Sequence, residues 1–185
     1  MAKKLKGKEW YEIVSPKLFN NKIIGETLAG DPKTLIDRRI ETPLINLIDD
    51  LSKYYYKIFF RIKEIKENKL YTEFDSLECL RDYIVRMVRH RIARIDTVQD
   101  LETKDKIKIR VKTITITNRR VSKSIEKSIS EFVKKQIEKE VTSTNLDDII
   151  KKIIEDKIKN NILKNGSKIY PLRAFEIRKI VRLNK

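Results

Sequence analysis

The stretch from Leu80 to Asp96, LRDYIVRMVRHRIARID, concentrates basic side chains that could bind phosphate. Arginine keeps its charge at any physiological pH, and its planar fork of donors fits two phosphate oxygens at once. The basic residues of the stretch are Arg81, Arg86, Arg89, His90, Arg91 and Arg94. Arginine this dense is typical of nucleic-acid binding, whereas the solvated face of an ordinary core helix mixes both signs of charge. The stretch is therefore predicted to contact a nucleic-acid backbone.

The same stretch carries apolar residues at helical spacing. They are Leu80, Ile84, Met87, Val88, Ile92 and Ile95. Residues three and four apart lie on one face of a helix. The spacing predicts a single amphipathic helix over residues 80–96, with basic side chains on and beside its polar face.

Groups that could do covalent or metal chemistry are scarce. The chain has one cysteine, Cys79, and one histidine, His90, so it cannot form an internal disulfide or one of the common transition-metal sites. The adjacent acids at 49–50 and 147–148 diverge on a strand or a helix and make no acid–base pair. The four glycines are scattered and form no phosphate loop. We expect no catalytic residue, no metal and no cofactor, so the chain is predicted not to be an enzyme.

Composition points to a polyanionic partner. The 185 residues include 43 Lys and Arg against 27 Asp and Glu, a formal net charge of +16, while 40% hydrophobic residues support a core. Such an excess repels itself unless a polyanion neutralises it. Nucleic acid is the favoured partner and an anionic membrane surface the weaker alternative. No apolar run approaches the length of a membrane span, and the N-terminus has no apolar stretch of signal-peptide length, so a cytoplasmic location is expected.

Changes in periodicity divide the chain into three parts. Residues 1–9 predict a basic arm, 10–120 a β-rich core that holds the 80–96 helix, and 121–185 a helical region with a basic tail. The core strands are predicted at 10–14, 39–48, 54–65, 70–74, 97–102 and 107–117, with a bulge at Thr113 where the alternation slips. Two helices are predicted, from Ser122 to a break at 142–145 and from Asn145 to a stop at 165–166. The last segment, 169–183, either returns to the sheet or lies along a partner. The fold class is α+β.

Several motifs, in one order along the whole chain, resemble one protein family. They are WYEIVSPKLF at 10–19, IGETL at 24–28, RDYIVRMVR at 81–89, RVK at 110–112, RR at 119–120, YPLR at 170–173 and EIRK at 176–179. This set resembles the small-subunit ribosomal protein family of archaea and eukaryotes called eS1, formerly S3Ae. One departure is that Cys79 and Leu80 stand where the family usually has Leu-Thr. The threonine helix cap is therefore missing, and Ser76 is a candidate substitute.

The resemblance implies an antiparallel β-barrel-like core with a central basic helix and flanking helices. It implies a place on the platform of the small ribosomal subunit. There the chain would bind 16S-type rRNA near its 3′ end, beside other platform ribosomal proteins and close to the mRNA exit, where mRNA is a further expected contact. It implies no catalytic activity and no small-molecule substrate.

The favoured hypothesis is therefore a structural rRNA-binding protein that reads phosphates and shape. The expected RNA-binding residues are Lys3, Lys4, Lys6, Lys8, Trp10, Lys17, Arg81, Arg86, Arg89, His90, Arg91, Arg94, Arg110, Lys112, Arg119, Arg120, Lys123, Arg173, Arg178 and Lys179. Two alternatives stay open. One is a metal-dependent nucleic-acid-processing enzyme, such as a nuclease, whose carboxylates converge from distant positions. The other is a DNA-compacting protein.

Overall fold

The computed structural model describes residues 7–48 and 50–183. Lys3, Lys4 and Lys6 of the expected basic arm lie outside the described residues. The chain forms two compact units, Met1–Ser76 and Leu77–Lys185, and the strand Lys69–Cys79 runs from one into the other. Each unit is described by itself.

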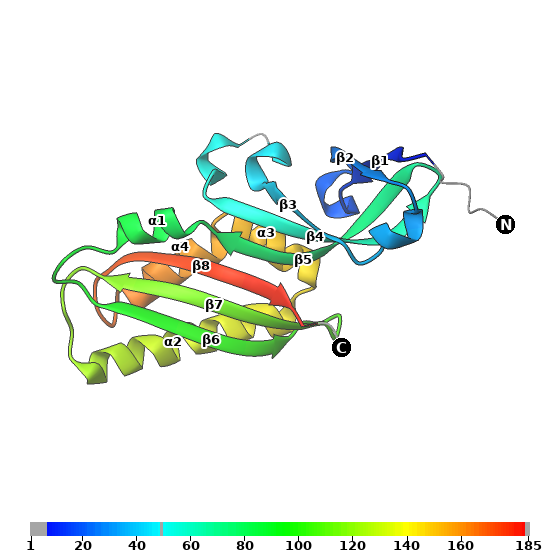
Figure 1. Cartoon of the computed structure of the whole chain (residues 1–185). Coiled ribbons are helices and arrows are strands. Elements are labelled where there is room, and N and C mark those ends of the chain that lie inside the picture. Colours follow the sequence, from blue (N-terminus) through cyan, green and yellow to red (C-terminus); the bar gives the residue numbers. More distant parts are fainter. Residues whose placement is uncertain (1–6, 49, 184–185) are drawn as a thin grey trace. The chain divides into compact units, whose positions relative to one another are not determined.

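The first unit is built on five strands with short 3₁₀ turns between them (Figure 1). The strands are β1 (Glu9–Val14), β2 (Ile23–Ala29), β3 (Arg39–Pro43), β4 (Tyr56–Lys66) and β5 (Lys69–Cys79), and the 3₁₀ turns are η1 (Lys17–Phe19), η2 (Pro32–Leu35), η3 (Leu44–Asn46) and η4 (Leu51–Lys53). β1 pairs antiparallel with β2 and parallel with β5, β3 pairs antiparallel with β4, and β4 also pairs with β5. The sheet is therefore mixed. One of its buried clusters contains Tyr11, Ile13, Ala29, Leu35, Ile62 and Leu70.

The predicted strands of this unit are confirmed, with different ends. β4 and β5 form the expected hairpin around a turn in which Glu67 has a positive φ of 54°. The strand predicted over 39–48 ends at Pro43, where η3 begins. Proline has no N–H to donate to a ladder, so pairing stops there.

The second unit contains four α-helices and three further strands in its described residues (Figure 1). They are α1 (Arg81–Met87), β6 (Arg94–Glu102), β7 (Lys108–Thr117), α2 (Lys123–Ser143), α3 (Leu146–Ile154), α4 (Lys157–Gly166) and β8 (Leu172–Arg182). β7 lies between β6 and β8 and is antiparallel to both. Helix α2 packs on β6, α4 packs on β8, and α3 packs on α2 and α4.

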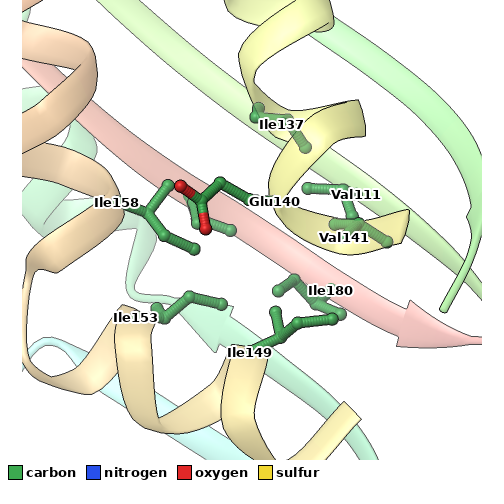
Figure 2. Close-up of a pocket in the computed structure, with 9 residues that line it drawn as sticks. Val111, Ile137, Glu140, Val141, Ile149, Ile153, Ile158 and Ile180 are labelled. Atoms are coloured by element: carbon green, nitrogen blue, oxygen red, sulfur yellow. The ribbon is translucent and has the colours of Figure 1, made fainter. Parts of the chain in front are cut away.

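An isoleucine-rich core fills the space between these helices and the sheet. Figure 2 shows a small cavity there, whose lining is aliphatic except for Glu140. The Glu140 carboxylate pairs with Lys152 Nζ at 2.8 Å. Because one charged group is already paired and the rest are Ile and Val, we assign this cavity to core packing.

The prediction of a single helix over residues 80–96 is wrong. Helix α1 ends at Met87, Val88 is extended, Arg91 has a left-handed φ of 62°, and β6 begins at Arg94. From Arg94 onward exposed and buried side chains alternate, and nine consecutive residues pair with β7. Ile95 fits a helical stripe by its spacing, but its pairing with Thr115 of β7 places it in a strand. Arg89, His90 and Arg91 therefore lie in a turn.

Helix α1 also begins without a side-chain cap, as the missing threonine predicts. Ser76 does not replace it. Ser76 is fully buried in β5, and its hydroxyl accepts a hydrogen bond from the Arg39 guanidinium.

Three other predictions for the second unit have clear outcomes. The last segment returns to the sheet as β8, and the expected bulge is confirmed as a register shift between Lys112 and Thr113. The second C-terminal helix is two helices, because Asp156 adopts a left-handed φ of 56° between α3 and α4.

The α+β class is confirmed, but the barrel-like core is not. Among the described residues β2 pairs only with β1, β3 only with β4, and β6 only with β7. The eight-stranded sheet is therefore open, because closure would require these edge strands to pair as well.

Candidate nucleic-acid interface

Three turns meet at one end of the β6–β7–β8 sheet, around Thr117 (Figure 1). The Ala93 N–H donates to Thr117 Oγ1 at 3.1 Å, and the Thr117 N–H donates to the Ala93 carbonyl at 3.1 Å. The Asn118 N–H donates to the Pro171 carbonyl at 3.2 Å. These bonds hold the α1–β6, β7–α2 and α4–β8 turns side by side. We call residues 87–93, 117–123 and 167–173 the three-turn end.

The three-turn end carries positive charge alone. Its seven cations, all exposed, are Arg89, Arg91, Arg119, Arg120, Lys123, Lys168 and Arg173, and the exposed side chain of His90 lies in the same segments. The three segments contain no Asp or Glu. None of the seven cations forms a salt bridge with a described residue. Seven charges without local neutralisation create a strong field that attracts phosphates.

The opposite end of the same sheet has a different balance. Segments 102–108 and 144–148 contain Lys104, Lys106 and Lys108 but also four carboxylates. One of these, Asp105, accepts a hydrogen bond from the Leu146 N–H at 3.1 Å and so caps α3. The excess charge of this unit is therefore unevenly distributed, and the three-turn end is the part suited to a polyanion.

Most of the sequence-predicted residues that the structure describes fall into three groups by location. The structure brings Arg89, His90, Arg91, Arg119, Arg120, Lys123 and Arg173 together at the three-turn end. Arg81 and Arg86 are exposed on α1, and Arg178 is exposed on β8. In the first unit Lys8 precedes β1, Trp10 lies on it, and Lys17 lies in η1, all exposed.

Three predicted cations already have acidic partners. Arg94 pairs with Asp96 at 2.8 Å, and Lys179 pairs with Glu78 at 2.9 Å. Arg110 donates two hydrogen bonds of 2.6 Å to Asp100, and these bonds hold the pKa of that carboxyl below its usual value. Lys112, half-buried on β7, has no such partner among the residues described. The paired cations are weaker candidates because their charge is neutralised locally.

Lys168 and the pair Arg39 and Arg61 were missed by sequence reasoning. Arg39 and Arg61 are register partners on β3 and β4, and both bind Asp75, at 2.9 and 3.1 Å. The Arg39 guanidinium also lies 3.9 Å from the centre of the Phe59 ring. Only the strand register could have revealed this cluster, because its members are far apart in sequence.

A buried charge network attaches α1 to the rest of the second unit. Glu176 of β8 is 1% exposed and accepts hydrogen bonds from Lys159 Nζ of α4 and, at 3.3 Å, from the Tyr83 hydroxyl of α1. Burial lowers the pKa of Lys159, but the hydrogen bond and the charge of Glu176 outweigh burial, so that pKa is raised overall. This network positions the helix that carries Arg81 and Arg86.

We predict that Cys79, buried beside this network, does not react in the native state. Burial, reinforced by the charge of Glu176, raises the pKa of its thiol from 9.0 to about 12. Iodoacetamide at pH 8 is expected to label the unfolded chain and not the native one, as mass spectrometry would show. Complete labelling of the native chain would contradict the buried thiol.

The same shift predicts a loss of stability in alkali. Below pH 9 both the folded and the unfolded thiol are protonated and stability is unaffected. Between about pH 9 and 12 only the unfolded thiol ionises, so the free energy of unfolding falls by about 1.4 kcal/mol per pH unit. The Cys79→Ala variant lacks this contribution and serves as the control in urea titrations.

Two further findings bear on other functions. None of the described helices is long and apolar enough to cross a membrane. Within residues 7–48 and 50–183, no group of three or more His, Cys, Asp or Glu side chains is arranged to hold a metal ion.

Comparison with known proteins shows one consistent likeness. A model of the Ribosomal S3Ae family matches residues 1–185. The chain is 38% identical to the small ribosomal subunit protein eS1 of Methanopyrus kandleri, over 95% of this chain and 85% of that protein. It is 34% identical to the eS1 proteins of Sulfurisphaera tokodaii, over 95% of this chain and 91% of that protein, and of Methanobrevibacter smithii, over 97% and 93%.

Proposed function

Because the chain belongs to the Ribosomal S3Ae family, we propose that it is a structural component of the small ribosomal subunit that binds 16S-type rRNA through its three-turn end. The observation that carries the RNA-binding part is the set of seven exposed cations, without an acid, on three turns held together at Thr117. The family is structural and not enzymatic, so the chain has no catalytic role.

Charge and shape account for this recognition. A-form RNA has a deep, narrow major groove that side chains cannot read, so proteins bind it chiefly through phosphates and 2′-hydroxyls. Five of the seven cations are arginines, whose guanidinium groups bind phosphate oxygens in pairs. The hydrogen bonds at Thr117 and Asn118 hold the main chains of the three turns together, and so bring these charges close to one another. Arg81 and Arg86 are exposed on α1, the helix that leads into the first of these turns.

The placement within the subunit is part of the proposal. We place the chain on the platform near the mRNA exit, beside other ribosomal proteins and within reach of mRNA, as the resemblance to the family implies. The relatives' names support the small subunit itself.

Salt dependence and competition test the proposed function. The full chain is expected to bind a 16S-type rRNA fragment with an affinity that falls by several orders of magnitude between about 50 and 200 mM salt. It should prefer this fragment to random duplex DNA of the same length at the same salt. Filter retention of labelled RNA and DNA measures both. Equal affinity for the two polyanions would instead support the DNA-compacting alternative.

A further inference from the structure

The outward face of the β1–β2 hairpin differs from the rest of this basic chain. Trp10 on β1 stands directly opposite Leu28 on β2, and these side chains are 62% and 40% exposed. Next to them Glu12 stands directly opposite Glu26. We call these four residues the hairpin face. Tyr11 and Ile13, which alternate with Trp10 and Glu12 along β1, lie on the other face and are buried in the core.

The two glutamates are placed at a cost. Like charges directly opposite each other on neighbouring strands are destabilising. Neither carboxylate forms a salt bridge with a described residue, although Lys and Arg outnumber Asp and Glu by 43 to 27 in the sequence. Lys69 of β5 stands beside Glu12 in the parallel register but forms no salt bridge with it. A cation supplied by a partner could contact both carboxylates at once.

Trp10 and Leu28, the apolar half of the face, favour arginine as that cation. An arginine guanidinium stacks favourably on a tryptophan ring and also pairs with carboxylates through its N–H fork. An RNA backbone fits poorly, since its phosphates would meet the Glu12 and Glu26 charges. Trp10, Glu26 and Leu28 are exposed in the described structure, so a partner can reach this face.

From this juxtaposition we propose that the hairpin face docks an arginine-bearing segment of another protein, with a guanidinium held between Trp10 and the Glu12–Glu26 pair. Trp10 then contacts protein and not RNA, which departs from the sequence-based expectation that Trp10 binds RNA. The inference rests on the proposed function only for the source of the segment, a neighbouring ribosomal protein.

Trp10 is the only tryptophan in the sequence, so its fluorescence reports directly on this face. The probe is a short acetylated, amidated peptide of alternating glycine and arginine, and its matched control replaces each arginine by neutral citrulline. At low salt the arginine peptide is expected to change the emission of the full chain in a saturable way, whereas the citrulline peptide does not. An equal response to both peptides would overturn the proposal.

Charge-neutral variants test the role of the carboxylates. Glu12→Gln with Glu26→Gln should weaken the arginine peptide about tenfold. The control Glu131→Gln with Glu138→Gln has the same net charge but changes exposed residues of α2, and it should bind like the wild type. Unchanged binding by the Glu12 and Glu26 variant would refute the site.

An RNA measurement separates this proposal from the proposed function. Filter retention of labelled rRNA by the Glu12 and Glu26 variant should stay within about threefold of the wild type, because phosphate contacts lie elsewhere. Addition of the RNA should leave Trp10 emission unchanged. A change in Trp10 emission on addition of RNA would overturn the proposal and assign the face to nucleic acid. Loss of the preference for rRNA, with peptide binding intact, would contradict only the proposed function.

Discussion

Replacing Arg119 and Arg120 together by glutamate is expected to lower the affinity for 16S-type rRNA about 100-fold near 0.15 M salt. Both side chains are exposed and have no acidic partner in the described structure, so each change removes a phosphate contact and adds a repulsive charge. The slope of log affinity against log salt should also become shallower by about two units, because two fewer counterions are released.

The matched control lies at the other end of the same sheet. Lys104→Glu with Lys106→Glu changes the net charge by the same amount, in a turn that already contains Asp105. This variant is expected to lose far less affinity for rRNA, and its slope of log affinity against log salt should stay close to that of the wild type. Equal losses in the two variants would show that net charge, and not the three-turn end, governs binding.

The two variants can be compared only if both keep the stability of the wild type. The turn at 117–123 is held by main-chain groups and by Thr117, whose hydroxyl donates to the Arg119 carbonyl at 2.6 Å. The arginine side chains take no part in these bonds. Both double variants should therefore unfold at the same urea concentration as the wild type.

The composition of the three-turn end could be predicted from sequence, but its assembly could not. Arg89, Arg91, Arg119 and Arg120 were all expected to contact RNA because arginine is dense around them. Their meeting depends on the register that pairs Arg94 with Ile116 and Thr117 with Leu172. Lys168 was missed for the same reason, since only the return of β8 to the sheet brings its turn to this end.

The error at residues 80–96 has a physical cause. Ile92 and Ile95 are three residues apart, so they fit a helical stripe that begins at Ile84. Ile95 also begins an alternation in which it and Thr97 are buried while Arg94 and Asp96 are exposed. The pairing of β6 with β7 favours the second pattern, and a single sequence does not show the partner strand.

The buried network was also beyond sequence analysis. Glu176 lies 93 residues from Tyr83 and 17 from Lys159, and nothing local marks it as buried. Its role becomes visible only when β8, α4 and α1 pack together. This network is the basis of the second large effect that we expect.

Glu176→Gln is expected to destabilise the second unit by roughly 3 kcal/mol, because it leaves the Lys159 ammonium in a partly buried position without the carboxylate that pairs with it. Urea unfolding followed by circular dichroism at 222 nm measures this loss, since all four described α-helices belong to this unit. Lys164→Met, on the exposed side of the same helix α4, is the control and should leave stability nearly unchanged.

The double variant Glu176→Leu with Lys159→Met distinguishes a paired charge from simple packing. Removing both charges avoids the isolated ammonium, so most of the lost stability should return. The Tyr83 hydroxyl still loses its acceptor, and α1 is then held less firmly. We therefore expect the double variant to be nearly as stable as the wild type but to bind rRNA more weakly, because Arg81 and Arg86 are no longer held in position. Wild-type RNA affinity in the double variant would show that the network stabilises the fold without positioning α1.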